Sequence, residues 1–236
     1  MIGTLFTTRR GGVSVAPYDE FNLGGAVGDD PAAVRVNRTV LAERVGLPAG
    51  RFVWMDQVHS ALVRTVGRPG DDPPGECDGI VTAVPGVALG VLAADCVPIL
   101  ARDERAGVIG AAHAGRRGAA AGIAGRLLDA MVQVGAAVPD VSVQLGPGIC
   151  GRCYEVPAGM RDEVERTLSG SAVLTARGTP GLDLRAGLRR QLLAAGVSAV
   201  QVDSRCTYED SELYSHRRGA PTGRLAGVIW RTPAAS

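Results

Sequence analysis

Strand-like runs followed by a reactive side chain recur along the first half of the chain. Residues 51–58 precede His59, residues 87–94 precede Asp95 and Cys96, and residues 106–112 precede His113. Apolar runs of this length, bounded by charge and glycine, are typical of strands buried on both faces. The pattern predicts a strand, a polar loop and a strand within 91–118, and neighbouring strands whose ends bring the reactive side chains together.

The rest of the chain shows signals for both helices and strands. Apolar positions at helical spacing follow an acidic start at Asp29–Asp30–Pro31 and stop at Gly46, which predicts a helix. Further helices are expected at 118–134, 157–168 and 182–195, and further strands at 4–10, 141–145, 197–202 and 225–230. The Pro/Gly/Asp-rich segment 67–79 is expected to be a loop within one domain, because candidate ligands lie on both sides of it. One α/β or α+β domain over 1–236 is the simplest organisation.

Composition excludes several classes of function. The 236 residues are 46% hydrophobic and 21% charged, as in an ordinary globular protein. With 25 basic and 24 acidic residues the net charge is +1, so the sequence predicts neither nucleic-acid nor membrane binding. No signal-peptide pattern precedes the first predicted strand. Five cysteines, an odd number, then indicate reduced thiols in the cytoplasm.

The three side chains at the predicted strand ends form a candidate metal site. His59, Cys96 and His113 suit zinc, and three protein ligands leave the open fourth position of a catalytic site. Copper binding in vitro is also compatible with this set. Each residue taken alone is more often a packed core residue. The joint interpretation is favoured because two of the only three histidines in the chain occupy equivalent contexts.

Two further segments carry candidate anion-binding groups. Arg9 and Arg10 precede a Gly-Gly turn, where backbone amides and guanidinium groups together suit an anion, although a solvated arginine pair fits equally well. The segment 206–218 (CTYEDSELYSHRR) contains the third histidine, His216, and ends on two arginines. Either arginine could close over an anionic substrate, or the segment could be a solvated loop with internal ion pairs. His216 is a weak third candidate for the metal site.

Cys150 and Cys153 form a Cys-x-x-Cys pair. Such a pair can be redox-active or half of a zinc knuckle. Here a Gly-Pro-Gly turn precedes the pair, Pro157 follows it, and no second Cys-x-x-Cys supplies partners. The sequence therefore predicts packed thiols.

Several motifs resemble those of one family. They are TTRRGGVS at 7–14, DQVHS at 56–60, ADCVPIL at 94–100, AAHAGRRG at 111–118, GPGICGRCYEV at 146–156 and YSHRRGAPTGR at 214–224. They span nearly the whole chain and look like the signatures of the YfiH-type family, also called the laccase-domain, multicopper polyphenol oxidase or peptidoglycan-editing-factor family. One position departs from the family pattern, because Arg116 stands where the family usually has tryptophan.

The resemblance implies a fold, a metal site and an activity. It implies a single α+β domain with two mixed β-sheets layered between helices, an αββα-type sandwich. It implies a zinc site at His59, Cys96 and His113. It also implies phosphorolysis of adenosine, inosine, guanosine and methylthioadenosine, with adenosine deamination as a side activity. The Arg116 departure puts purine stacking at that position in question, but leaves the metal site untouched.

Multicopper laccase chemistry is rejected by counting ligands. A multicopper oxidase needs a blue-copper site and a trinuclear cluster, and imidazole is the usual copper ligand. Three histidines in the entire chain cannot supply them.

The sequence therefore predicts a zinc-dependent purine nucleoside phosphorylase. Arg9 and Arg117 are the first candidates for phosphate, because a guanidinium fork matches its oxygens. Asp95 is a candidate acid–base group, or a strand-end residue satisfied by backbone amides. The other candidate substrate- or phosphate-binding residues are Tyr154, Glu155 and Arg217.

Three alternatives stay open. One is a zinc-dependent deaminase with Glu155 or Asp95 shuttling protons. Another is a hydrolase with Cys96 as nucleophile and His113 as base. The third is a non-catalytic metal-binding factor in peptidoglycan synthesis. The expected partners are purine nucleosides and phosphate, and the sequence does not decide between monomer and homodimer.

Overall fold

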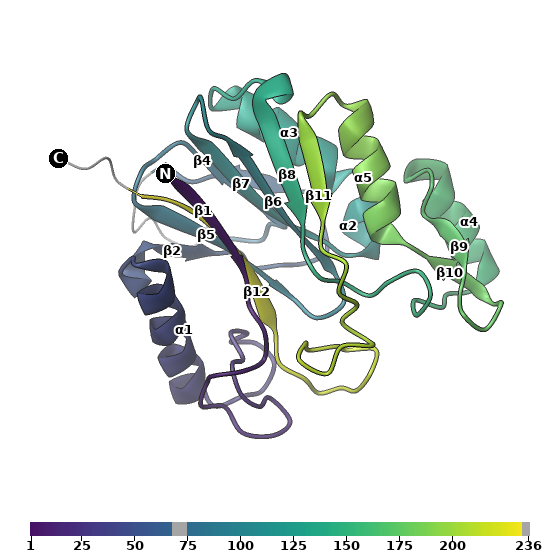
Figure 1. The fold of residues 1–236 in the computed structure, drawn as a ribbon, viewed down its shortest axis with the longest axis horizontal. Coiled ribbons are helices and arrows are strands. Elements are labelled where there is room, and N and C mark those ends of the chain that lie inside the picture. The colour runs from purple at the N-terminus through teal and green to yellow at the C-terminus, as the bar shows by residue number, and fades with distance from the viewer. Residues whose placement is uncertain (68–74, 233–236) are drawn as a thin grey trace.

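A computed structural model describes residues 1–67 and 75–232 of the chain (Figure 1). Residues 68–74 of the loop predicted at 67–79 lie outside the described residues.

Two mixed β-sheets form the centre of the fold. The four-stranded sheet has the order β1 (Ile2–Phe6), β12 (Leu225–Arg231), β5 (Val87–Ala93), β2 (Phe52–Trp54). The six-stranded sheet has the order β11 (Ala199–Val202), β8 (Val141–Leu145), β6 (Val97–Asp103), β7 (Val108–Ala114), β4 (Gly79–Thr82), β3 (Val63–Thr65). Pairing is antiparallel except for β2 with β5, β11 with β8 and β3 with β4. A small antiparallel pair, β9 (Ala172–Leu174) and β10 (Pro180–Leu182), lies apart.

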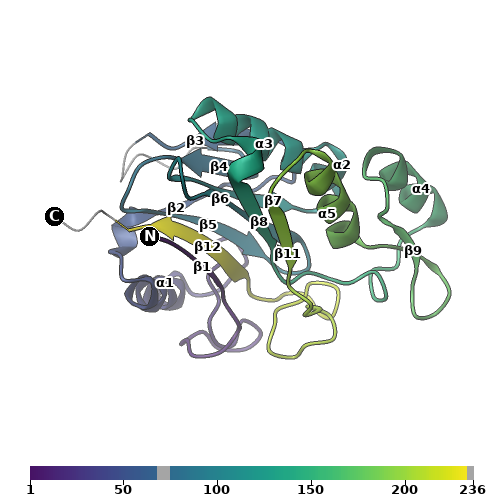
Figure 2. The ribbon, with the colours of Figure 1, turned by 45° about the horizontal axis from the view of Figure 1, so that its top comes forward.

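Helices cover the outer faces of the two sheets (Figure 2). Helix α1 (Pro31–Val45) packs on the four-stranded sheet through Leu41 and Val45. The six-stranded sheet is covered on its other face by α2 (Arg116–Ala120), α3 (Ile123–Gln133) and α5 (Leu184–Ala194), with α4 (Ala158–Thr167) beside them. Short 3₁₀ turns occur at Ala49–Arg51 and Val138–Asp140. This αββα arrangement confirms the predicted α+β fold with two mixed sheets.

Strand β5 shows why its sequence is an unbroken apolar run. Leu89 and Val91 face the six-stranded sheet, whereas Ala88 and Leu92 face the layer that contains α1. Both faces of the strand are therefore buried, and no position on it can be polar at low cost.

Three predicted elements need correction. The segment expected to be a polar loop contains β6, seven residues long, in the middle of the larger sheet. The predicted strand at 51–58 is a strand only over Phe52–Trp54. The single helix expected at 118–134 is two helices, α2 and α3, because Gly122 between them has a φ of +86°.

Within the described residues, no helix has both the length and the apolar character needed to cross a membrane.

Two glycines at the start of α3 provide a matched test of this break. Gly125 lies within α3 and a Cβ there would meet no atom within 4 Å, so Gly125→Ala should stabilise the protein by about 0.5–1 kcal/mol. Gly122 is equally unobstructed but has a positive φ, so Gly122→Ala should destabilise it by about 1 kcal/mol or more. Urea unfolding of both variants measures the difference. If both substitutions changed the free energy of unfolding by the same amount and in the same direction, the helix break assigned to Gly122 would be contradicted.

Candidate metal centre and active-site cavity

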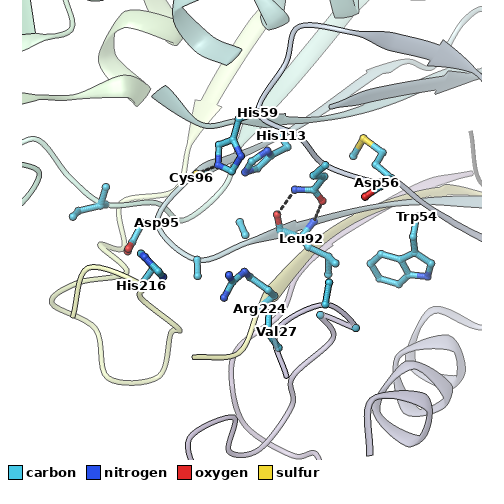
Figure 3. A pocket seen from close by; sticks show the side chains of 18 of the residues that line it. Val27, Trp54, Asp56, His59, Leu92, Asp95, Cys96, His113, His216 and Arg224 are labelled. Atoms are coloured by element: carbon cyan, nitrogen blue, oxygen red, sulfur yellow. Dashed lines mark hydrogen bonds between the residues drawn. The ribbon is translucent and has the colours of Figure 1, made fainter. Parts of the chain in front are cut away.

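The three predicted metal ligands lie together in the structure. His59 Nε2 is 3.8 Å from Cys96 Sγ, and the ring centroids of His59 and His113 are 4.8 Å apart. One ligand atom from each of the three lies within 4.8 Å of the others. Figure 3 shows the two imidazole rings side by side, next to Cys96.

The route by which Cys96 and His113 meet differs from the prediction. Strands β5 and β7 belong to different sheets, so their ends are not neighbours within one sheet. Instead, β6 and β7 pair in antiparallel register, and His113 near the end of β7 lies opposite Pro98 at the start of β6. Cys96 directly precedes β6. The β6–β7 hairpin therefore brings the thiol to the imidazole.

His59 is held by a buried carboxylate that the sequence prediction missed. Asp78 is fully buried and accepts hydrogen bonds from the backbone N–H groups of Val58 (3.2 Å), His59 (3.0 Å) and Ser60 (2.6 Å). The Ser60 hydroxyl donates a further bond of 2.8 Å. These contacts hold the loop in which His59 has a φ of +61°, a conformation that few non-glycine residues adopt.

The same carboxylate orients the second histidine. Asp78 Oδ1 lies 2.8 Å from His113 Nδ1, so the Nδ1–H donates to Asp78 and Nε2 is the ring atom left for a metal. Burial opposes ionisation of Asp78, but the hydrogen bonds from His113 and Ser60 outweigh it and hold its pKa at about 2. An acidic residue between Cys77 and the apolar segment Gly79–Thr82 was the available sequence signal.

The charges within the group favour a thiolate at Cys96. Burial opposes ionisation of the thiol, but hydrogen bonds from His113 and His59 lower its pKa to about 6. Burial likewise opposes the charge on His113, but its bonds to Asp78 and Cys96 raise its pKa to about 9.

The site fits a zinc or copper ion by its donor set and its space. Two imidazoles and one thiolate are ligands that both metals accept. A Cβ at Gly115 would lie 2.5 Å from the His59 ring and 3.1 Å from Cys96 Sγ, so this glycine leaves the space between them free.

The three ligands line a cavity of about 680 Å³, within the usual range for small-molecule sites. Its other lining residues include aromatic, apolar, neutral polar, acidic and cationic side chains, among them Arg38, Trp54, Gln57, Leu92, Asp95, Arg116, Ile149, Tyr154, His216, Arg217 and Arg224. Gln57 is fixed by a pair of 2.8 Å hydrogen bonds to the backbone of Leu92. The cavity therefore combines a metal site with apolar surface and positive charge.

Of the predicted substrate-binding residues, Tyr154 and Arg217 line this cavity. Arg217 lies over the Tyr154 ring at 5.1 Å and donates a 2.9 Å bond to the carbonyl oxygen of Glu155. Glu155 itself lines a neighbouring hollow.

Asp95 lines the cavity, but both of its carboxylate oxygens accept hydrogen bonds. The Thr207 hydroxyl donates at 2.6 Å and the backbone N–H of Arg217 at 2.7 Å. Of the two roles expected for Asp95, the geometry matches the strand-end residue satisfied by neighbouring donors.

The structure places the first two phosphate candidates away from the cavity. The Arg9 guanidinium is paired with Asp19 at 2.6 Å, and Arg10 with Glu20 and Glu212. Arg117 is exposed on α2, and neither Arg9 nor Arg117 is among the lining residues. Arg116, which precedes Arg117 in the chain, lines the cavity instead.

Comparison with known proteins identifies the family. A family model described as multi-copper polyphenol oxidoreductase laccase matches residues 3–232. The chain belongs to this laccase-domain family. The histidine count still excludes a multicopper centre in this member, because three histidines cannot supply its imidazole ligands.

Relatives named purine nucleoside phosphorylase cover nearly the whole chain. One from Mycobacterium tuberculosis is 55% identical over 224 residues, covering 95% of this chain and 90% of the relative. One from Deinococcus radiodurans is 43% identical over 225 residues, covering 95% and 87%.

Two solved structures superimpose closely on this chain. YlmD from Geobacillus stearothermophilus has a TM-score of 0.91 at 37% identity, covering 98% of this chain and 92% of that chain. YfiH from Bacillus licheniformis has a TM-score of 0.90 at 29% identity with the same coverage.

Replacing Gly115 tests whether the space between the ligands is needed for metal. Gly115→Ala should lower zinc affinity at least about tenfold, since ligand-shell disturbances typically cost about 10–100-fold. Its φ of −74° suits alanine, so the fold should persist. Gly125→Ala is the matched control. Zinc retention against a competing chelator measures the effect, and an unchanged affinity in Gly115→Ala would contradict the assigned site.

Proposed function

We propose that this protein catalyses phosphorolysis of purine nucleosides, releasing the base and ribose 1-phosphate. The observation that carries the proposal is a single cavity in which the His59, Cys96 and His113 group shares its walls with arginine and aromatic side chains. The proposed substrates are adenosine, inosine, guanosine and methylthioadenosine. The proposed setting is the cytoplasm, where the thiols stay reduced.

His59, Cys96 and His113 would hold zinc. When bound, the metal supplies a Lewis acid on the cavity wall. Asp78 contributes by holding the His113 tautomer and the backbone that carries His59.

Phosphate binding is assigned to the cationic side of the cavity. Arg116 and Arg217 both lie close to Tyr154, and Arg224 also lines the cavity. Arg217 uses Nη1 for the Glu155 carbonyl, and Arg224 uses Nη1 for the carbonyls of Thr222 and Gly223. The remaining N–H groups of each guanidinium are available to oxygens of a phosphate.

The apolar part of the wall suits a purine. Trp54, Leu92 and Ile149 line it, and Trp54 is already covered on one face by Arg38 at 4.6 Å. Gly90 also lies against the Trp54 ring, and the Phe52 ring stacks with it at a centroid distance of 6.0 Å, so Trp54 contributes apolar wall rather than a free stacking face.

The arginine side chains that line the cavity suit the charges that develop when a glycosidic bond is cleaved by phosphate. The bond breaks with positive charge developing on the sugar and negative charge on the base. Bound phosphate stabilises the sugar charge, and the surrounding arginines keep phosphate ionised in the cavity.

Two alternatives compete with this reaction. Adenosine deamination is a proposed side activity, although the carboxylates of Asp78 and Asp95 are already engaged by hydrogen bonds. A thiol hydrolase is favoured by one observation, the line Asp78–His113–Cys96, which has the order of an orienting acid, a base and a nucleophile.

Product analysis separates the three reactions. Purified protein incubated with adenosine should yield adenine and ribose 1-phosphate only when phosphate is present. Inosine formed without phosphate would indicate deamination. Metal removal followed by zinc addition should abolish and then restore phosphorolysis. Activity on ester or amide substrates that survives chelation would replace the proposal with the thiol hydrolase.

Two adjacent arginines provide a matched test of the phosphate assignment. Arg116→Ala should raise the apparent KM for phosphate about 10–100-fold, the equivalent of one charge-assisted hydrogen bond of about 1.5–3 kcal/mol. Arg117→Ala removes the same charge from the exposed side of α2 and should change that KM less than about threefold, or about 0.6 kcal/mol. Phosphate titration of both variants measures the contrast. The reverse order would assign phosphate to Arg117.

A further inference from the structure

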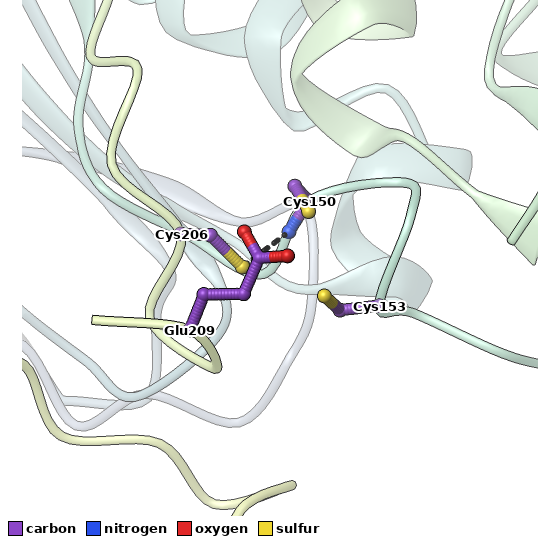
Figure 4. Close-up of side chains that lie close together, drawn as sticks. All are labelled: Cys150, Cys153, Cys206 and Glu209. Atoms are coloured by element: carbon purple, nitrogen blue, oxygen red, sulfur yellow. Dashed lines mark hydrogen bonds between the residues drawn. The ribbon is translucent and has the colours of Figure 1, made fainter. Parts of the chain in front are cut away.

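A second group of potential metal ligands lies outside the cavity wall that carries His59. One ligand atom from each of Cys150, Cys153, Cys206 and Glu209 lies within 4.8 Å of the others. Figure 4 shows the three sulfur atoms and the Glu209 carboxylate turned toward one another. Neither the proposed reaction nor the first metal site uses any of these four residues.

The spacing along the chain is that of two short turns. Cys150 and Cys153 are separated by two residues in the loop after β8, and Cys206 and Glu209 are separated by two residues after β11. Ligand pairs at this spacing are typical of structural zinc sites. Because the second pair carries glutamate in place of its second cysteine, it does not appear in the sequence as a second Cys-x-x-Cys.

Hydrogen bonds close each of the two turns and join one turn to the other. The N–H of Cys153 donates to the carbonyl oxygen of Cys150 at 3.0 Å, which closes the first turn. The N–H of Asp210 donates to the carbonyl oxygen of Cys206 at 2.9 Å, which closes the second. Across the two turns, the N–H of Cys150 donates to Cys206 Sγ at 3.3 Å. An amide donor to the sulfur stabilises the thiolate form that a metal requires.

We propose that Cys150, Cys153, Cys206 and Glu209 bind a second divalent transition-metal ion of the zinc class. Three thiolates and one carboxylate make a complete tetrahedral set, so this site is closed and structural, whereas the His59 site has only three protein ligands. All five cysteines are free thiols in the structure.

A bound ion would tie together two loops that reach the cavity. The first loop continues from Cys153 into Tyr154, and the second from Cys206 to Arg217. Asp95 already anchors the second loop through Thr207. The ion adds a crosslink between the loops themselves, and this role holds whatever reaction the cavity performs.

Metal counting on site-directed variants tests the proposal. Cys96→Ala disables the first site, and the Cys96→Ala protein should still retain about one zinc per chain. The zinc affinity of this second site should fall as the pH is lowered, because the thiols must lose their protons to bind the ion. Adding Cys153→Ser or Glu209→Gln should remove that ion. Cys77→Ala and Glu43→Gln, which alter a cysteine and an exposed carboxylate elsewhere, should leave it bound.

Cobalt provides a readout that does not depend on folding of the double variants. Cobalt-loaded Cys96→Ala protein should show an intense thiolate-to-cobalt absorption from three sulfur ligands. Absence of that absorption, or full zinc retention after Cys153→Ser, would overturn the site. Unchanged affinity in Glu209→Gln would overturn the closed four-ligand set. A disulfide among the three cysteines in protein that is thiol-blocked on lysis and purified without reductant would also overturn the proposal.

Discussion

The candidate active site depends on one buried carboxylate. Asp78 is fully buried and has its charge balanced by donors on two sides, the backbone around His59 and the ring of His113. Because an unpaired charge there would be costly, the loop and the ring must both stay in place while Asp78 is ionised. This single group therefore couples the direction of one metal ligand to the backbone conformation of another.

A second carboxylate, in an unusual backbone position, organises another part of the cavity lining. Asp95 has a φ of +86° and lies between Ala94, which follows β5, and the ligand Cys96. Its two oxygens anchor Thr207 and the backbone of Arg217, which lie far away in the sequence. Two strong hydrogen bonds offset the strain of this conformation. They also fix the junction between the two sheets, the Cys96 thiolate and the loop that carries Arg217.

Local patterns in the sequence predicted most elements and the membership of the metal group, but not the reasons for its assembly. Apolar runs located β5 and β7, yet pairing through β6 brings Cys96 to His113, and register is a tertiary property. The choice between Arg116 and Arg117 depends on the direction of a short helix that begins at Arg116. Asp78 and Glu209 escaped notice because an isolated acidic residue carries no spacing signal until its partners are placed beside it.

The same three side chains suit two different chemistries. With a metal bound, the Cys96 thiolate is a ligand that shares its charge with the ion, so it is a weaker nucleophile than a free thiolate. Without a metal, the low pKa of Cys96 and its contact with an Asp78-oriented His113 are the features of an activated nucleophile. In the proposed site, metal occupancy therefore affects which of these reactions the three side chains favour. The arginines that line the cavity favour an anionic co-substrate, which the proposed phosphorolysis uses and thiol hydrolysis does not.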